Sequence, residues 1–227
     1  MENVNRWKAT GMELRYNIMD IGERFDKIAD TYDTGVRGLP RYDQLRKVMF
    51  DLILFSKDYE ANVLELGIGT GTTAAEFLER YPAARLMGVD ASSKMIEQSR
   101  QKLEQFKSRT ELVQCNFKDF QPNGQFDIAY SILAVHHVPD EDKEALFRRI
   151  REILKPGGAF IIIDLVNGTN DQLTERYQTL SFGRAHKEEG SALSLMEYIE
   201  CLRETGFQTV DVAWKQYRLA CIIAFKT

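Results

Sequence analysis

The stretch VLELGIGTGTTA, residues 63–74, places three glycines at alternate positions directly after an aliphatic run. Glycine destabilises regular helices and strands, so it is usually kept where the backbone needs an unusual conformation or a close approach. The aliphatic run predicts a strand, and the segment TTAAEFLERY after the last glycine predicts a helix. A glycine-rich turn from strand to helix predicts a ligand site at the carboxyl end of that strand. The alternative is a tight turn that binds nothing.

From residue 58 onward, short apolar runs alternate with helical stretches. Strands are predicted over 62–67, 85–90, 110–116, 126–133, 159–166, 207–214 and 218–226, and helices over 72–81, 92–106, 141–155 and 195–206. Continuous apolar strands separated by helices are typical of a parallel sheet with helices on both faces, an α/β fold. The link between the last two strands is too short for a parallel crossover, so we expect an antiparallel hairpin there.

The first part of the chain differs from the rest. Apolar residues at three- and four-residue steps predict a helix from Met12 to about Asp33, and a second amphipathic helix follows around Leu45 to Ile53. We therefore expect a helical N-terminal lid over residues 1–57 that forms a single compact unit with an α/β domain over 58–227. The polar stretch that follows Asn167, about 25 residues long, predicts no regular element.

Composition narrows the function classes. The net charge of −4 and the lack of a basic stripe make a nucleic-acid partner an unfavoured prediction. Three widely spaced cysteines favour free thiols in a reducing compartment over a disulfide framework or a metal site. The longest apolar runs are too short for a membrane span, and the N-terminus lacks the apolar core of a signal peptide. We expect a cytoplasmic protein without membrane attachment, whose oligomeric state the sequence leaves open.

The spacing of the glycines helps to decide which kind of ligand the loop would bind. A dinucleotide-binding loop has the pattern G-x-G-x-x-G, whereas here Gly71 comes one residue too early and Thr72 stands in the last position. Glu65 would also place a carboxylate close to an anionic pyrophosphate. Both features disfavour a nicotinamide cofactor, and the carboxylate of Glu65 favours a cationic ligand, although a nicotinamide-dependent oxidoreductase remains the alternative. A second alternative for Glu65 is a hydrogen bond to nearby backbone N–H groups.

The string Glu65-Leu-Gly67-Ile-Gly69-Thr-Gly71 resembles the first motif of class I S-adenosylmethionine-dependent methyltransferases. Later segments are similar to the motifs and lid helices of small-molecule members, namely GVDASSKMIE, QCNFKDF, FDIAYSILAVHHV, LKPGGAFIIIDLV and, before them, RFDKIADTYD and LPRYDQL. The resemblance implies a Rossmann-like, seven-stranded and mostly parallel sheet whose last strand is antiparallel. It also implies S-adenosylmethionine as the cofactor, with S-adenosylhomocysteine as its product.

The same resemblance implies a set of cofactor-binding residues. They are Glu65, Gly67, Gly69, Gly71, Asp90, Ala91, Met95, Asn116, Phe117 and Ser131, with Tyr32 and Arg37 from the lid. The carboxylate of Asp90 suits the two ribose hydroxyls, because its two oxygens can accept from a vicinal diol. Asn116 stands where the family usually has an acid that meets the adenine amino group. Met95 and Phe117 could equally be core residues, and Arg37 a solvated loop charge.

The sequence indicates the catalytic residues less clearly than it indicates the cofactor. His136 and His137 follow the fourth strand, but adjacent residues cannot both face one point, which disfavours a metal pair. We take His136 as the candidate general base, with a structural role as the alternative. The expected reaction is in-line transfer of a methyl group to a small-molecule acceptor through an oxygen, nitrogen, sulfur or carbon atom. The alternatives are a non-catalytic S-adenosylmethionine-binding module and, less favoured, a tRNA acceptor.

Overall fold

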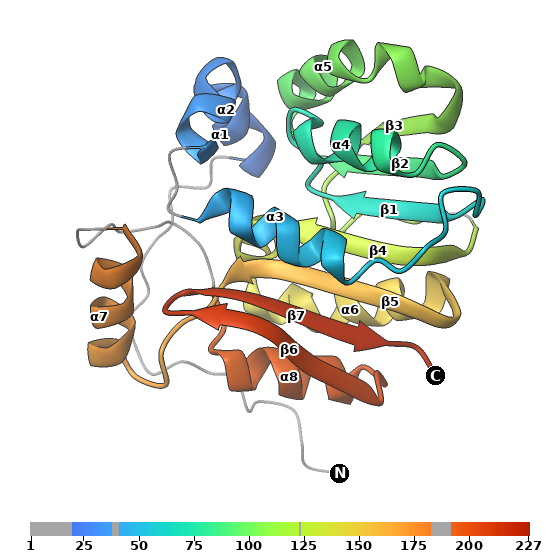
Figure 1. Ribbon diagram of the computed structural model, residues 1–227. Coiled ribbons are helices and arrows are strands. Elements are labelled where there is room, and N and C mark those ends of the chain that lie inside the picture. The colour runs from blue at the N-terminus through green and yellow to red at the C-terminus, as the bar shows by residue number, and fades with distance from the viewer. Residues whose placement is uncertain (1–19, 38–40, 123, 183–191) are drawn as a thin grey trace.

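A single seven-stranded sheet organises the computed structural model of the protein, which describes residues 20–37, 41–122, 124–182 and 192–227 (Figure 1). Its strands are β1 (Asn62–Leu66), β2 (Arg85–Asp90), β3 (Thr110–Gln114), β4 (Phe126–Ile132), β5 (Leu154–Leu165), β6 (Thr209–Gln216) and β7 (Leu219–Phe225). Their order across the sheet is β3-β2-β1-β4-β5-β7-β6. Strand β7 is antiparallel to both β5 and β6, while the pairs from β3 to β5 are parallel. The predicted mostly parallel sheet with a closing antiparallel hairpin is confirmed.

Helices cover both faces of the sheet. They are α1 (Ile21–Asp26), α2 (Ala29–Arg37), α3 (Tyr42–Asp51), α4 (Thr72–Arg80), α5 (Ser93–Lys102), α6 (Asp140–Ile153), α7 (Asp171–Phe182) and α8 (Leu195–Glu204), with short 3-10 turns η1 (Glu104–Arg109) and η2 (Val135–His137). Apolar residues of α3, α4 and α5 pack on one face of the sheet, and those of α6 and α8 pack on the other. Successive strand residues alternate between these two cores: Ile161 faces the first, and Ile162 faces the second. Burial on both faces explains why the central strands β1, β4, β5 and β7 are mostly apolar, whereas the edge strands β3 and β6 include exposed polar residues.

The structure departs from the sequence predictions in three places. Residues 171–182 form helix α7 within the polar stretch where no element was predicted. The helix predicted over 92–106 ends at Lys102, and η1 follows it. Strand β5 begins at Leu154, five residues before the predicted start, and a register shift between Phe126 and Ile128 accommodates the added residues. In addition, the single helix predicted from Met12 to about Asp33 lies partly outside the described residues, which begin at Asp20; its described part is interrupted by a turn at Lys27 and Ile28, and the second helix runs on to Arg37.

Membrane-spanning helices and metal-binding clusters are both absent from the residues that the structure describes. Within that part of the chain, no helix combines the length and apolar character that a bilayer crossing requires. The same residues contain no group of three or more His, Cys, Asp or Glu side chains arranged to hold a metal ion.

Candidate active site

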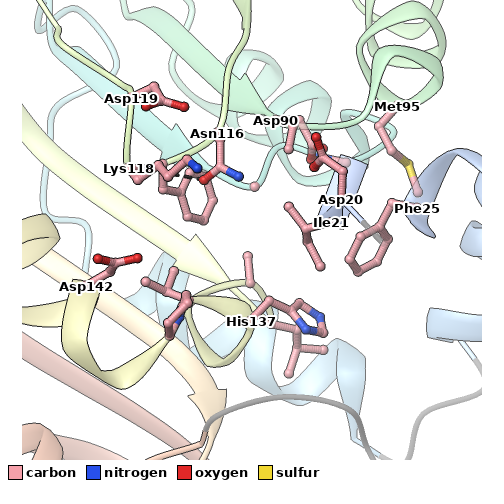
Figure 2. Close-up of a pocket in the computed structure, with 18 of the residues that line it drawn as sticks. Asp20, Ile21, Phe25, Asp90, Met95, Asn116, Lys118, Asp119, His137 and Asp142 are labelled. Carbon is pink, nitrogen blue, oxygen red and sulfur yellow. Dashed lines mark hydrogen bonds between the residues drawn. The ribbon is translucent and has the colours of Figure 1, made fainter. Parts of the chain in front are cut away.

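A cavity of about 510 Å³ opens at the carboxyl edge of the sheet, beneath α1 and α2 (Figure 2). Eight of the predicted cofactor-binding residues line it: Tyr32, Gly67, Gly69, Asp90, Ala91, Met95, Asn116 and Phe117. They come from four separate segments that the parallel topology brings to one edge, which is where ligands bind in open α/β sheets. The cavity is therefore the candidate active site.

The three glycines of the first motif all adopt left-handed backbone conformations, with φ of +75° at Gly67, +54° at Gly69 and +77° at Gly71. A Cβ atom on Gly67 would lie 2.4 Å from the Cβ of Ala134, so this residue must be glycine for steric reasons as well. Gly67 and Gly69 line the cavity, whereas Gly71 packs against Ser99 of α5 and forms the N-cap of α4. Two of the glycines thus clear space for a ligand, and the third starts the helix.

Asp90 ends β2 with its carboxylate fixed by the neighbouring backbone. One oxygen accepts from the Gly69 N–H and the other from the Ser92 N–H, each at 2.9 Å. Burial raises the pKa of Asp90, and these two N–H donors counteract part of that rise. The side chain lines the cavity in a defined orientation, as a ribose-binding carboxylate requires.

Glu65 lies outside the large cavity. It is 3% exposed and accepts a hydrogen bond of 2.8 Å from the hydroxyl of Tyr130 on β4. Burial raises its pKa to about 8, so the carboxyl group is mostly protonated at neutral pH. The interpretation of Glu65 as a charged carboxylate beside a cationic ligand does not match this arrangement, and neither does the alternative of backbone N–H partners. Glu65 lines only a small neighbouring hollow of about 30 Å³.

Ser131 also points away from the cavity. It is fully buried, and its hydroxyl donates to the Leu66 carbonyl at 2.9 Å, which ties β4 to β1. The next three residues along the chain, Ile132 to Ala134, line the cavity in its place. Asn116 lines the cavity, and its side-chain oxygen accepts from the Lys118 N–H at 3.3 Å. The roles predicted for Asn116 and Phe117 at the adenine remain predictions that this placement allows.

The lid closes the cavity from the other side. The Tyr32 ring lies over Gly69, 3.6 Å from where a Cβ on that glycine would be, and contacts Phe25 edge-on with ring centroids 6.0 Å apart. Helix α1 lies directly on the end of β2, since a Cβ on Gly22 would sit 2.6 Å from the Ala91 carbonyl oxygen. Arg37 ends α2, and its side chain is outside the part of the chain that the structure describes.

Carboxylates on one side of the lid hold it to α5 and to the glycine loop. Asp26 accepts from the Ser92 hydroxyl at 2.5 Å and the Lys94 N–H at 3.0 Å, at the N-terminus of α5. These hydrogen bonds, that of Ser92 foremost, lower the pKa of Asp26. Asp33 accepts from the Lys102 ammonium at 2.7 Å and the Thr70 hydroxyl at 2.5 Å. Because Thr70 belongs to the glycine loop, the lid and the loop are positioned together.

The structure separates the two histidines. His136 is 6% exposed and does not line the cavity; its Nδ1 lies 2.5 Å from an Asp164 carboxylate oxygen, and its backbone N–H donates to the other oxygen at 2.8 Å. His137 lines the cavity instead, next to Phe25 (Figure 2). The geometry therefore gives no support to His136 as the general base. The sequence indicated that His136 and His137 face different ways but gave no sign of which one faces the cavity, and the structure shows that it is His137.

Three comparisons with known proteins bear on this site. A family model described as a methyltransferase domain matches residues 63–158. A carboxy-S-adenosyl-L-methionine synthase from Nautilia profundicola is 23% identical over 88% of this chain and 93% of its own length. A malonyl-[acyl-carrier protein] O-methyltransferase from Ilyobacter polytropus is 26% identical over 70% of this chain, which spans 57% of that protein.

Solved structures show the same fold. Human N-acetylserotonin methyltransferase in complex with S-adenosylmethionine superposes with a TM-score of 0.63 at 20% identity, over 90% of this chain and 56% of that one. The matched segment, residues 63–158, contains the glycine loop, Asp90 and the histidine pair. Motifs, sheet order and domain match agree: residues 63–158 match a methyltransferase domain, and the chain has the fold of the class I S-adenosylmethionine-dependent methyltransferases.

Proposed function

We propose that this protein transfers the methyl group of S-adenosylmethionine to a small-molecule acceptor bound beneath the lid. The observation that carries the proposal is the cavity itself, which has the glycine loop and Asp90 on one wall and Phe25 and Tyr32 of the lid on another. The chain works in the cytoplasm, with residues 1–57 acting as the lid of the domain formed by residues 58–227.

The residues at the cavity fit the cofactor. Asp90 would accept from the ribose hydroxyls, while Met95, Asn116 and Phe117 would surround the adenine. Gly67 and Gly69 leave the backbone open for the methionine part. When bound, the cofactor supplies an electrophilic methyl carbon on a sulfonium. The protein contributes alignment of the acceptor and exclusion of water, and alignment of this kind is worth about 7–11 kcal/mol of barrier in favourable cases.

The acceptor would lie among the lid, the loop after Ser131 and the residues between Asn167 and Leu195. Apolar side chains of Ile21, Phe25 and Leu133 line this part of the cavity, which suits a partly apolar small molecule. The names of the curated relatives refer to small molecules or to an acyl group on a carrier protein, which is in keeping with such an acceptor.

A second candidate is chemistry on S-adenosylmethionine itself. The relative from Nautilia profundicola, whose name is that of a carboxy-S-adenosyl-L-methionine synthase, aligns over nearly its whole length. In that case S-adenosylmethionine would be a substrate, not a methyl donor: a second substrate that carries a transferable carboxyl group would donate it, and the S-adenosylmethionine methyl carbon would lose a proton in exchange.

Thermal unfolding with S-adenosylmethionine, S-adenosylhomocysteine and NADH tests the cofactor assignment. A ligand at about 100 times its Kd stabilises by about 2.7 kcal/mol, so both adenosyl ligands should raise Tm by several degrees while NADH does not. Asp90→Ala should lose the shift, and Asp211→Ala, an exposed carboxylate on β6, should keep it. A shift with NADH alone would instead favour the nicotinamide-dependent alternative.

Mass spectrometry of the products then separates the two candidates. Incubation with S-adenosylmethionine and a metabolite panel should yield S-adenosylhomocysteine together with a methylated acceptor. A carboxylated adenosyl product in place of S-adenosylhomocysteine would favour the second candidate. Binding without any turnover across the panel would favour the non-catalytic binding module.

A further inference from the structure

The loop between β4 and α6 is built to present His137 to the cavity. Leu133 has φ of +53°, a left-handed conformation that is strained for a branched residue, and its N–H donates to the Ile163 carbonyl at 2.8 Å. The turn η2 follows, closed by hydrogen bonds from the His137 N–H to Ala134 and from the Val138 N–H to Val135. Strain of this kind persists only where the surroundings enforce it, and it is often found at functional sites.

His136 anchors this loop from below. Asp164 of β5 is 1% exposed and accepts from the His136 backbone and, at 3.4 Å, from the hydroxyl of Tyr198 on α8. Burial alone would raise the pKa of Asp164, but its interactions with His136, the hydrogen bond from the Leu165 N–H and the electrostatic interaction with His137 together outweigh burial, and the pKa lies below its usual range. A charged carboxylate thus holds His136 in place, and the His137 ring packs on the His136 ring with centroids 3.9 Å apart.

The His137 imidazole lies on the cavity wall across from Asp90, with the Phe25 ring edge-on at 5.1 Å (Figure 2). Gly67 and Gly69, where the methionine part of the cofactor would lie, line the same cavity. His137 therefore lies between the lid and the glycine loop, where donor and acceptor would meet.

Other titratable side chains of the described residues that line the cavity are Asp20, Tyr32, Asp90, Lys118, Asp119 and Asp142. Asp20 caps α1 by accepting from the Gly22 N–H, and Asp90 is held by two backbone N–H groups. Burial raises the pKa of Tyr32, which makes it a poor proton acceptor near neutral pH. An imidazole, with a reference pKa of about 6.5, is in general a better base for proton transfer at neutral pH than a carboxylate.

We propose, on the basis of the function above, that His137 accepts the proton of the acceptor and that the positive charge of the bound sulfonium keeps its imidazole neutral until the methyl group is transferred. As the acceptor atom bonds to the methyl carbon, the carbon–sulfur bond breaks and its electron pair stays on sulfur. The acceptor's proton passes to the ring nitrogen. One positive charge is thus lost from the cofactor and one gained by His137, so the total charge is unchanged.

The effect of the sulfonium charge on His137 can be measured without an acceptor. A nearby positive charge disfavours imidazolium, so His137 should titrate at lower pH with S-adenosylmethionine bound than with S-adenosylhomocysteine, by roughly one pH unit or more. The nearby carboxylates, Asp164 included, are present in both complexes, so their effect cancels in the difference.

Proton NMR of the imidazole ring protons in the wild-type protein measures this directly. The chain has three histidines, His136, His137 and His186, and spectra of His137→Gln identify the signal of interest. Each saturated complex is titrated between about pH 5.5 and 8, the range in which an ordinary histidine changes charge. The expected result is a lower midpoint for His137 with S-adenosylmethionine. Equal midpoints in the two complexes, or no titration in either, would overturn the proposal.

Two further measurements distinguish a failure of the proposed function from a failure of the inference about His137. If neither adenosyl ligand raises Tm, the proposed function fails together with this inference; if both bind and His137 titrates alike in each, only the inference fails. Asp164→Asn tests the anchoring role of the carboxylate, with Tyr198→Phe as a milder change at the same group. Loss of the midpoint difference in folded Asp164→Asn supports that Asp164 positions His137, and an unchanged difference contradicts it.

Discussion

Substituting Gly67 by alanine tests the close approach of Gly67 to Ala134 at the wall of the proposed cofactor site. An L-residue in the left-handed region costs about 1–2 kcal/mol. At Gly67 the added Cβ would also lie 2.4 Å from the Cβ of Ala134, a contact that must be relieved by moving the strained loop. Such overpacking costs about 1–3 kcal/mol more. For a chain of this size, each kcal/mol lowers Tm by about 2–4 °C.

Gly157→Ala is a matched control. Its φ is +78°, against +75° at Gly67, and nothing lies within 4 Å of the position that a Cβ would take. Urea unfolding of both variants should therefore show the conformational cost alone at Gly157 and an additional loss of about 1–3 kcal/mol at Gly67. Thermal shifts with S-adenosylmethionine should survive in Gly157→Ala and disappear in Gly67→Ala. Equal destabilisation of the two variants, or a full ligand shift in Gly67→Ala, would refute the reasoning.

Three other predictions concern carboxyl groups. Asp90→Asn should weaken S-adenosylmethionine binding at least tenfold in calorimetry, because one of its charged acceptors becomes a donor; an unchanged Kd would remove Asp90 from the site. The pKa of Asp26 is lowered in the fold, so its contribution to folding stability is present above pH 3.8 and is lost as the pH falls through the lowered pKa. At neutral pH, Asp26→Asn should therefore speed hydrogen exchange in α1. The control Asp43→Asn, on α3, should not have this effect. The pKa of Glu65 is raised from 4.5 to about 8, so wild-type stability should decrease as pH rises between those values, and urea midpoints of Glu65→Gln should lack that slope.

Much of the fold followed from the sequence because the central strands of the sheet are buried on both faces. Runs such as RLMGVD have continuous apolar character, and β2 occupies the predicted residues, Arg85–Asp90. Helix α7 was missed for the opposite reason: its segment is mostly polar, and only Gln178 and Ser181 within it are buried. Leu173, Tyr177 and Leu180 do recur at helical spacing, but none of them is buried, so the apolar stripe that marks a core-facing helix is short.

The candidate site residues also divide into those that the sequence placed at the cavity correctly and those that it did not. Residues that line the cavity through the backbone or at a strand end, such as Gly67 and Asp90, are marked by spacing alone. Glu65, Ser131 and His136 are polar residues in the right segments whose direction depends on a partner elsewhere in the chain. Spacing along one strand cannot show that Tyr130 or Asp164 will take up those side chains, because such contacts arise only from the folded sheet.

The position of β7 has a consequence for how the chain is made. This strand lies between β5 and β6, yet both are synthesised before it. Until residue 225 has left the ribosome, the edge of β5 carries the apolar run AFIIIDLV with its backbone groups unpaired on that side. Such an edge readily pairs with other chains. Nascent chains halted before β7 should therefore depend on chaperones far more than those that have completed it.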